Sequence, residues 1–236
     1  MARLPAIFLS HGSPMHALDA GGAGTVWRAI AESLPRPRAV LVASAHWETS
    51  LPVLSGVERP ETIHDFSGFP AALYQLDYPA SGSPALAQQV AGLLKAAGHA
   101  PTVNASRGID HGAWVPLRWM YPEHDVPVVQ LSVQPALGTE HHWRLGEALA
   151  SLADDGVLVI GSGHVTHNLR DWSLHRHEAA SLDYVVQFSD WLHQRLVSGD
   201  RDAVLDYRAR APSAARAHPT EEHFLPLFVA WGAAGI

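Results

Sequence analysis

The chain has 236 residues, of which 47% are hydrophobic and 17% are charged, a composition typical of a globular protein rather than a disordered one. Its formal net charge is −7 and it has no run of Lys or Arg, which argues against binding to nucleic acid or to an anionic membrane. It has no cysteine but 16 histidines, so disulfides and thiolate metal centres are excluded, and imidazole and carboxylate groups would have to hold any transition metal.

The N-terminal part of the sequence alternates apolar runs with a helical pattern. Residues 6–14 form an apolar run ending in His-Gly-Ser-Pro, residues 26–34 have helical spacing, and residues 39–47 form a second apolar run that also ends beside a histidine. Continuous apolar runs of this length predict strands buried on both faces, as in a largely parallel sheet. Residues 51–78 are rich in Gly, Pro and aromatic residues, which predicts a long functional loop with one short strand near residues 52–56.

Strand and helix patterns continue to alternate after this loop. Ser83 as N-cap, Pro84 in the first turn and Gly98 as the stop predict a helix between them. The remaining predicted elements are a strand over residues 126–133, an apolar strand that ends in a His-containing turn within residues 157–168, helices over residues 138–153 and 179–197, and a last helix with Thr220 as its N-cap. We therefore expect one α/β domain over residues 1–236, with a largely parallel or mixed central sheet flanked by helices.

The sequence has no feature that predicts a membrane protein. Its first residues run directly into an apolar strand and lack the long apolar stretch of a signal peptide. No window approaches the ~18 uninterrupted apolar residues that a membrane span needs. We therefore expect a cytoplasmic protein without membrane or nucleic-acid partners.

Three histidines follow the ends of separate apolar runs. They are His11, His46 and His167, and in open α/β sheets ligands bind beyond the carboxyl ends of the strands. Each of them alone is more often a core or surface histidine with one hydrogen bond, but their shared context favours a site for zinc, iron or copper. Seven others lie in polar or helix-surface contexts that predict solvated side chains: His99, His124, His141, His142, His175, His177 and His193.

Three further segments place an acid beside a histidine. Asp110-His111 precedes a predicted helix, and His64-Asp65 lies within the long loop. Such a pair can orient a metal ligand or can be an ordinary surface pair. Near the end of the chain, Glu221 and Glu222 precede His223, and the simplest role of these glutamates is to stabilise the positive end of the last helix.

Six motifs, in the same order along the chain, resemble those of the class III extradiol ring-cleavage dioxygenases. The similarity is greatest to the 4,5-DOPA extradiol dioxygenase branch, which is related to the catalytic subunit of protocatechuate 4,5-dioxygenase. The motifs are His11-Gly12-Ser13-Pro14, Ser44-Ala45-His46-Trp47, Ile63-His64-Asp65-Phe66, Asp110-His111-Gly112, Val165-Thr166-His167-Asn168-Leu169 and Pro219-Thr220-Glu221-Glu222-His223. The resemblance implies an enzyme that opens the ring of a catechol, DOPA-like or another 3,4-dihydroxyphenyl compound, with O2, as a monomer or small homo-oligomer.

The resemblance also implies the metal ligands. His11 and His46 match two of them, and His223 matches a third, with Glu222 beside it as a competing candidate. The protocatechuate enzymes use two His and one Glu, the set typical of non-haem Fe(II) oxygenases. We expect one divalent metal per chain, Fe(II) for dioxygenase activity and Zn(II) in the purified or crystallised protein.

Further matched residues are expected to act in catalysis or substrate binding. His167 matches the catalytic base, which in substrate-free zinc forms can also act as a fourth ligand. His111 matches a histidine on the substrate side and is expected to be catalytic. His64 and Asp65 lie in a family motif and, with Trp47, are expected to contact the substrate.

Two other functions use the same histidines. A zinc hydrolase would lower the pKa of a metal-bound water, and a non-catalytic metal-binding protein could share the fold. The presence of both His111 and His167 argues against the non-catalytic protein. A serine hydrolase is disfavoured, because Gly161-Ser162-Gly163 lacks the spacing of a nucleophile elbow.

Overall fold

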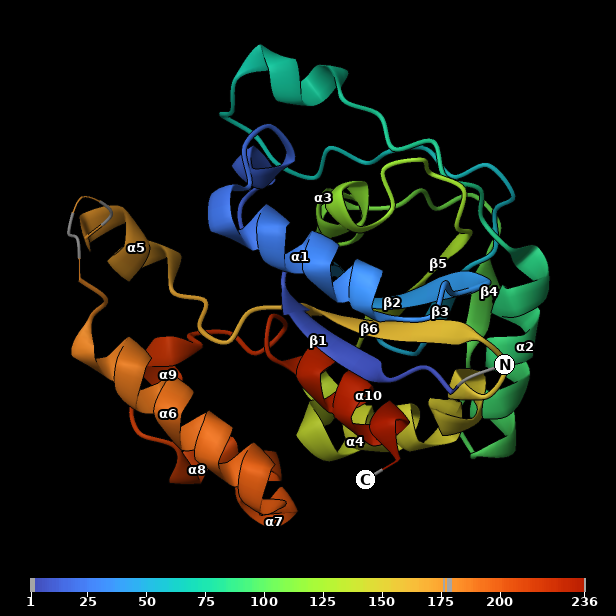
Figure 1. The fold of residues 1–236 in the computed structure, drawn as a ribbon. Helices are drawn as coiled ribbons and strands as arrows, with labels where there is room; N and C mark the ends of the chain where they lie inside the picture. The colour runs from blue at the N-terminus through green and yellow to red at the C-terminus, as the bar shows by residue number, and fades with distance from the viewer. Residues whose placement is uncertain (1–2, 176, 178–179, 236) are drawn as a thin grey trace.

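The computed structural model describes residues 3–175, 177 and 180–235, which include a six-stranded mixed sheet (Figure 1). The strands are β1 (Ala6–Ser10), β2 (Ala39–Glu48), β3 (Val53–Ser55), β4 (Thr102–Asn104), β5 (Val128–Val133) and β6 (Val157–Gly163). Their order across the sheet is β1-β6-β2-β5-β3-β4. Neighbouring strands run parallel except β3 and β5, which pair antiparallel through Leu54 and Leu131.

Helices cover both faces of this sheet. They are α1 (Gly21–Ser33), α2 (Pro84–Ala96), α3 (His111–Met120), α4 (Gly138–Leu149), α5 (Leu169–His175), α6 (Asp183–Ser198), α7 (Arg201–Leu205), α8 (Tyr207–Arg210), α9 (Ala214–Ala217) and α10 (Leu225–Ala234), with 3-10 turns η1 (Pro14–Ala17), η2 (Ala71–Gln75), η3 (Pro135–Leu137) and η4 (Ala150–Ala153). In Figure 1, α1 and α3 lie above the sheet, α4 and α10 lie below it, and α5 to α9 extend to one side.

The core is divided by the alternation of side chains along the central strands. Val40 and Val42 of β2 pack with α1 and α3, whereas Leu41 and Ala43 pack with α4 and α10 on the opposite face. Successive side chains of a strand point to opposite faces, so a central strand with helices on both sides must be apolar throughout. This explains the continuous apolar runs of the sequence.

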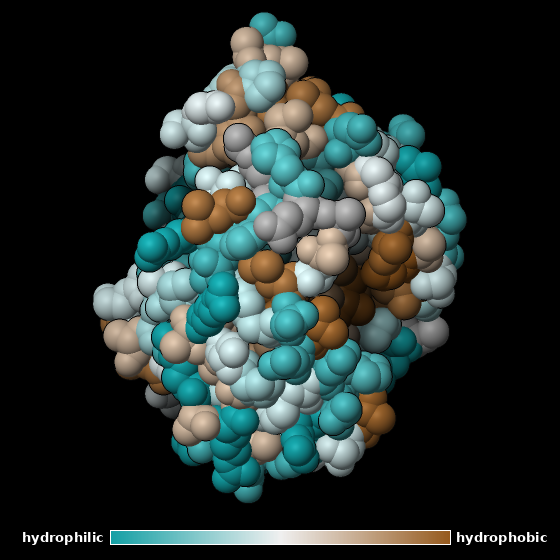
Figure 2. Space-filling model, turned by 90° about the vertical axis from the view of Figure 1, so that its left-hand side faces the viewer, coloured by the Kyte–Doolittle hydropathy of each residue, from teal (hydrophilic) through white to brown (hydrophobic). Residues whose placement is uncertain are grey.

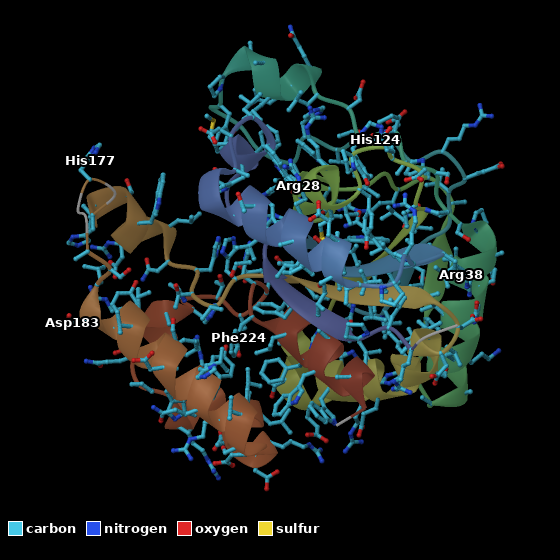
Figure 3. The ribbon with its side chains drawn as sticks, in the orientation of Figure 1. Arg28, Arg38, His124, His177, Asp183 and Phe224 are labelled. Atoms are coloured by element: carbon cyan, nitrogen blue, oxygen red, sulfur yellow. The ribbon has the colours of Figure 1, made fainter. Side chains whose placement is uncertain are left out.

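A third apolar cluster lies beside the sheet, between α6, α8 and the start of α10. Phe224, labelled in Figure 3 at the start of α10, packs against Tyr207 and Phe188 with ring centroids 4.5 and 5.6 Å apart. All three side chains are fully buried. The cluster therefore holds the segment that precedes α10 against the sheet, and this segment carries His223.

Glycines in β6 allow that segment to lie directly on the strand. A Cβ atom on Gly161 would lie 2.1 Å from the carbonyl oxygen of Pro226, and one on Gly163 would lie 2.0 Å from that of His223. The backbone N–H of His164 donates to this His223 oxygen at 2.8 Å. Both positions therefore need glycine because of close backbone approach, whereas Gly12 needs it because its φ of +73° is left-handed.

The structure confirms the α/β class and the mixed sheet. The short strand expected near residues 52–56 is β3, and the helix expected after Ser83 is α2, where Ser83 Oγ accepts from Leu86 N at 3.2 Å. That helix ends before Gly98, whose φ is +88°. Within the described ranges, no helix is both long and apolar enough to cross a membrane.

Two expectations about local structure are wrong. Thr220 does not cap the last helix, because residues 221–224 form a turn and α10 begins only at Leu225; its hydroxyl donates to Glu222 Oε1 at 3.0 Å instead. His142 is not solvated but fully buried on α4. Its Nε2 accepts from Gln134 N and its Nδ1 donates to Gly138 O, so the buried ring is satisfied at both nitrogens.

Candidate metal centre

A cluster of histidines lies at the carboxyl ends of the central parallel strands. His11 follows β1 directly, and His46 lies two residues before the end of β2. His164 and His167 follow β6, and His223 comes from the turn before α10. The strands alone thus bring two metal-ligand candidates to this edge, and the segment lying on Gly163 brings the third.

His11, His46 and His223 point the same ring nitrogen at one place. Nε2 of His46 lies 3.0 Å from Nε2 of His11 and 3.3 Å from Nε2 of His223. A metal at the usual distance of about 2.0–2.2 Å from each nitrogen, with angles of about 90–110°, requires nitrogens roughly 2.8–3.6 Å apart. The separations therefore fit a single small cation.

The hydrogen bonds of His11 fix which of its nitrogens carries the proton. Ser162 Oγ donates its only hydrogen to the carbonyl oxygen of Gly112. The 3.0 Å contact between Ser162 Oγ and His11 Nδ1 is therefore donated by the imidazole. In the neutral ring this leaves a lone pair on Nε2, pointed at the cluster.

Carboxylates set the same tautomer in the other two rings. Asp65 Oδ2 lies 3.3 Å from Nδ1 of His46, and Glu222 Oε1 accepts from Nδ1 of His223 at 2.9 Å. An ionised carboxylate only accepts, so Glu222 keeps the proton of His223 on Nδ1, and the negative charge of Asp65 favours the same tautomer in His46; Nε2 of each ring then keeps its lone pair. Such partners behind a ligating histidine are typical of metal sites.

Three lone pairs meeting at these distances repel one another unless a cation lies between them. A proton is disfavoured, because burial, followed by the neighbouring His164, lowers the pKa of His11 well below its ordinary value. Burial, followed by His111 and His223, likewise lowers the pKa of His46 to about 2. The donor set of neutral imidazoles therefore suits one divalent transition metal.

Glu222 is placed behind His223 rather than in the cluster. Its Oε1 accepts from His223 Nδ1 at 2.9 Å and from Thr220 Oγ1 at 3.0 Å. Burial raises the pKa of Glu222, but the hydrogen bonds from His223 and Thr220 outweigh it and lower the pKa to about 2. Of the two adjacent candidates, the structure thus directs a nitrogen of His223 toward His46.

The two expected catalytic histidines lie on opposite sides of this cluster. The His111 ring is 3.9 Å from the His46 ring between centroids, and its Nδ1 donates to Asp65 Oδ2 at 2.9 Å, which leaves the Nε2 lone pair free to accept a proton. The His167 ring stacks on His223 at 3.5 Å with an angle of 12° between planes. Burial, followed by His223, lowers the pKa of His167 to about 4, so the ring is neutral at pH 7.

Of the residues expected to contact substrate, the structure brings Asp65 to the cluster, whereas His64 and Trp47 make their described contacts elsewhere. His64 Nε2 donates to the carbonyl oxygen of Leu76 at 3.0 Å and thereby links the middle of the loop to its C-terminal part. Trp47 is buried, and its ring lies under the guanidinium of Arg107 at 4.7 Å. As the neighbour of His46 on a strand, it points to the opposite face.

Sequence reasoning missed two groups that contact the cluster. His164 received no role, yet its ring lies 4.5 Å from that of His11 and its Nε2 donates to Gly12 O at 3.3 Å. Ser162 is fully buried and orients His11 rather than acting as a nucleophile. The signal for Ser162 was a hydroxyl within an apolar strand, which must find a partner when it is buried.

A cavity lies beyond the His167 loop, and an aromatic side chain lies beside His111. A cavity of about 250 Å³ lies beside the His167 loop, where α5 and α6 meet; its lining includes Thr166, Asn168, Trp172 and Tyr184. On the face that carries α5 and α6, hydrophobic residues reach the surface among hydrophilic ones and border a hollow (Figure 2). On the other side of the cluster, the Phe66 ring lies 5.7 Å from that of His111. Phe66 therefore offers apolar surface to an aromatic ligand next to the cluster, whereas none of the cluster histidines lines the cavity.

Comparison with known proteins gives a family and relatives of nearly full length. Residues 5–236 match the family model described as the catalytic LigB subunit of aromatic ring-opening dioxygenase. A Beta vulgaris protein named 4,5-DOPA dioxygenase extradiol is 47% identical over 97% of this chain and 86% of its own length. An Escherichia coli K12 protein of the same name is 39% identical over 98% of this chain and 85% of its own length. The crystal structure of an uncharacterized Escherichia coli K12 protein matches with a TM-score of 0.81 at 34% identity, covering 98% of this chain and 89% of that one.

Proposed function

Because the chain belongs to the LigB family of aromatic ring-opening dioxygenases, we propose that it opens the ring of a DOPA-like catechol with O2 by extradiol cleavage, at a divalent metal held by His11, His46 and His223. Relatives named 4,5-DOPA dioxygenase extradiol support a 3,4-dihydroxyphenyl substrate. The family match over residues 5–236 supports one catalytic domain along the whole chain. Neither a hydrolase nor a non-catalytic protein is favoured by these relatives.

The observation that carries the proposal is the convergence of three imidazole lone pairs. His11 and His223 are hydrogen-bonded from behind by Ser162 and Glu222, and Asp65 lies 3.3 Å behind His46, so the Nε2 atoms point inward before any metal binds. All the donors are neutral nitrogens, which suits Fe(II) and Zn(II) alike. Fe(II), when bound, supplies the electron transfer to O2 that Zn(II) cannot, so we propose Fe(II) as the active metal.

The protein's own groups handle the protons of the substrate. A catechol that binds through its two adjacent oxygens must lose protons, and the Nε2 lone pair of His111 is oriented by Asp65 to accept one. His167, on the other side of the cluster, is neutral at pH 7 and can accept or return a proton there. We propose these two residues as the general acid–base pair, with the Phe66 side chain beside His111 as a wall for the ring.

The test is oxygen uptake by anaerobically prepared protein loaded with Fe(II). We expect one O2 consumed per DOPA or other catechol and a yellow ring-opened semialdehyde as product. A phenol with a single hydroxyl should bind weakly and remain uncleaved, because it displaces only one metal-bound water. The Zn(II)-loaded protein is the matched control and should bind catechols without turnover. Efficient ester or amide hydrolysis by the zinc form, with no catechol opened by the iron form, would establish the hydrolase instead.

A further inference from the structure

Both carboxylate oxygens of Asp65 contact histidines of the metal centre. Its Oδ2 accepts from Nδ1 of His111 at 2.9 Å and lies 3.3 Å from Nδ1 of His46. Its Oδ1 accepts from the backbone N–H of His111 at 2.9 Å. The side chain is only 20% exposed, so little of it remains for a ligand to touch.

The contact with the His111 backbone serves as the N-terminal cap of α3. His111 is the first residue of that helix, where a backbone N–H has no partner within the helix. Asp110 occupies the N-cap position but makes no cap hydrogen bond, because its carboxylate accepts from Ser44 Oγ at 2.7 Å and from Arg107 Nη2 at 3.2 Å. Asp65, from a distant loop, thus accepts the hydrogen bond at the start of α3 that the N-cap residue Asp110 does not accept.

The loop that carries Asp65 is fastened on both sides of it. Ile63 N donates to Ile109 O at 2.8 Å, and Trp114 Nε1 donates to Ile63 O at 2.9 Å. On the other side, the Phe66 ring packs edge-on against His111 at 5.7 Å between centroids. The carboxylate therefore has little freedom to turn away from the two histidines.

We propose that Asp65 is a positioning residue that orients the metal ligand His46 and the catalytic His111 through one carboxylate oxygen, rather than a substrate contact. The same oxygen directs the Nε2 of His46 toward the metal position and the Nε2 of His111 toward the substrate. The two rings lie 3.9 Å apart between centroids, so one anchor sets their mutual geometry. The role of Asp65 in orienting His111 rests on the proposed function, whereas its role in orienting His46, the metal half of the proposal, does not depend on it.

The experiment compares Asp65→Asn with wild type in two assays. Calorimetric titration of the metal-free chain with Zn(II) measures metal affinity, which reports on the ligand His46. Steady-state kinetics of the Fe(II) form on DOPA measures kcat and KM, and kcat reports on His111. We expect Zn(II) affinity to fall by about 10-fold or more and kcat to fall by about 10–100-fold, the usual effect of losing a group behind a metal ligand. KM should change by less than about threefold, because uniform substrate binding is not affected. Asp77→Asn, an exposed change in the same loop, is the matched control and should leave both quantities unchanged.

A double-mutant cycle with His111→Ala separates positioning of His111 from an independent role. If Asp65 acts through His111, Asp65→Asn should lower kcat by less than about threefold in the His111→Ala background. A rise of KM at unchanged kcat would show that Asp65 binds substrate and would overturn the proposal, as would wild-type Zn(II) affinity together with wild-type kcat. If wild type itself opens no catechol, the proposed function fails, but a Zn(II) affinity lowered only by Asp65→Asn still upholds the metal half.

Discussion

Gly163 lies so close to the segment carrying His223 that no side chain fits between them. A Cβ atom there would lie 2.0 Å from the carbonyl oxygen of His223. Because a carbon and an oxygen in contact stay about 3.3 Å or more apart, Gly163→Ala must displace this segment by roughly 1 Å. The displacement also removes the hydrogen bond that His164 N donates to the same oxygen.

The expected magnitude differs between the fold and the metal site. Overpacking of this kind costs about 1–3 kcal/mol in free energy of unfolding. Metal sites tolerate only about 0.2 Å in ligand distance, so a shift of His223 by roughly 1 Å removes it as a ligand. Zn(II) affinity should then fall by more than about 100-fold, beyond the effect of losing a group behind a ligand.

Denaturant unfolding of the metal-free chain and calorimetric titration with Zn(II) measure the two effects. Gly92→Ala is the matched control, because Gly92 lies within α2 and a Cβ atom there meets nothing within 4 Å. It should raise the free energy of unfolding by about 0.5–1 kcal/mol and leave Zn(II) affinity unchanged. If Gly163→Ala binds Zn(II) as tightly as wild type and unfolds at the same denaturant concentration, the close approach does not position His223.

His11→Ala or His46→Ala should abolish metal retention after gel filtration, whereas Glu222→Gln, whose amide oxygen can still accept from the third ligand, should weaken it by no more than about tenfold. His167→Ala should keep Fe(II) but lower kcat by roughly 10²–10⁴-fold; loss of metal and activity together in one preparation would make it a structural ligand instead. Burial lowers the pKa of His46 to about 2 and that of His142 to about 3, from 6.5 in the unfolded chain. The unfolded chain therefore binds protons first, so urea unfolding of the metal-free protein should show stability lost as pH falls below about 6.5, by roughly 1.4 kcal/mol per pH unit for each such histidine. Equal stability at pH 7.5 and 5.5 would contradict this.

The parts of the fold that sequence alone predicts are those governed by local pattern. The apolar runs of β1, β2 and β6 place His11 and His46 at one edge because parallel strands end together. Ser83, followed by proline, marks the start of α2 because capping depends only on the next few residues. Such signals need no knowledge of which segments meet in space.

What sequence did not predict depends on contacts between distant segments. Thr220 has the residue type of an N-cap, but the cluster around Phe224 holds residues 221–224 in a turn, and the hydroxyl bonds Glu222 instead. His142 looked exposed because its neighbours on α4 are polar, yet α4 buries that side against α10. His64 and Asp65 are adjacent in one motif, but the fold uses the first to close a loop and the second to hold two histidines.

The placement of charge around the metal follows from these contacts. In the proposed site, three neutral imidazoles would leave a divalent metal with its full +2 charge, which would favour a catechol that binds as an anion through both oxygens. Asp65 and Glu222 each lie one imidazole away from the metal position, so their negative charges offset part of that +2 without occupying a coordination position. A carboxylate bound directly as a fourth protein ligand, in addition to the three imidazoles, would fill one of the positions that the two catechol oxygens and O2 need. Keeping the carboxylates behind the rings therefore preserves those positions while still balancing the charge.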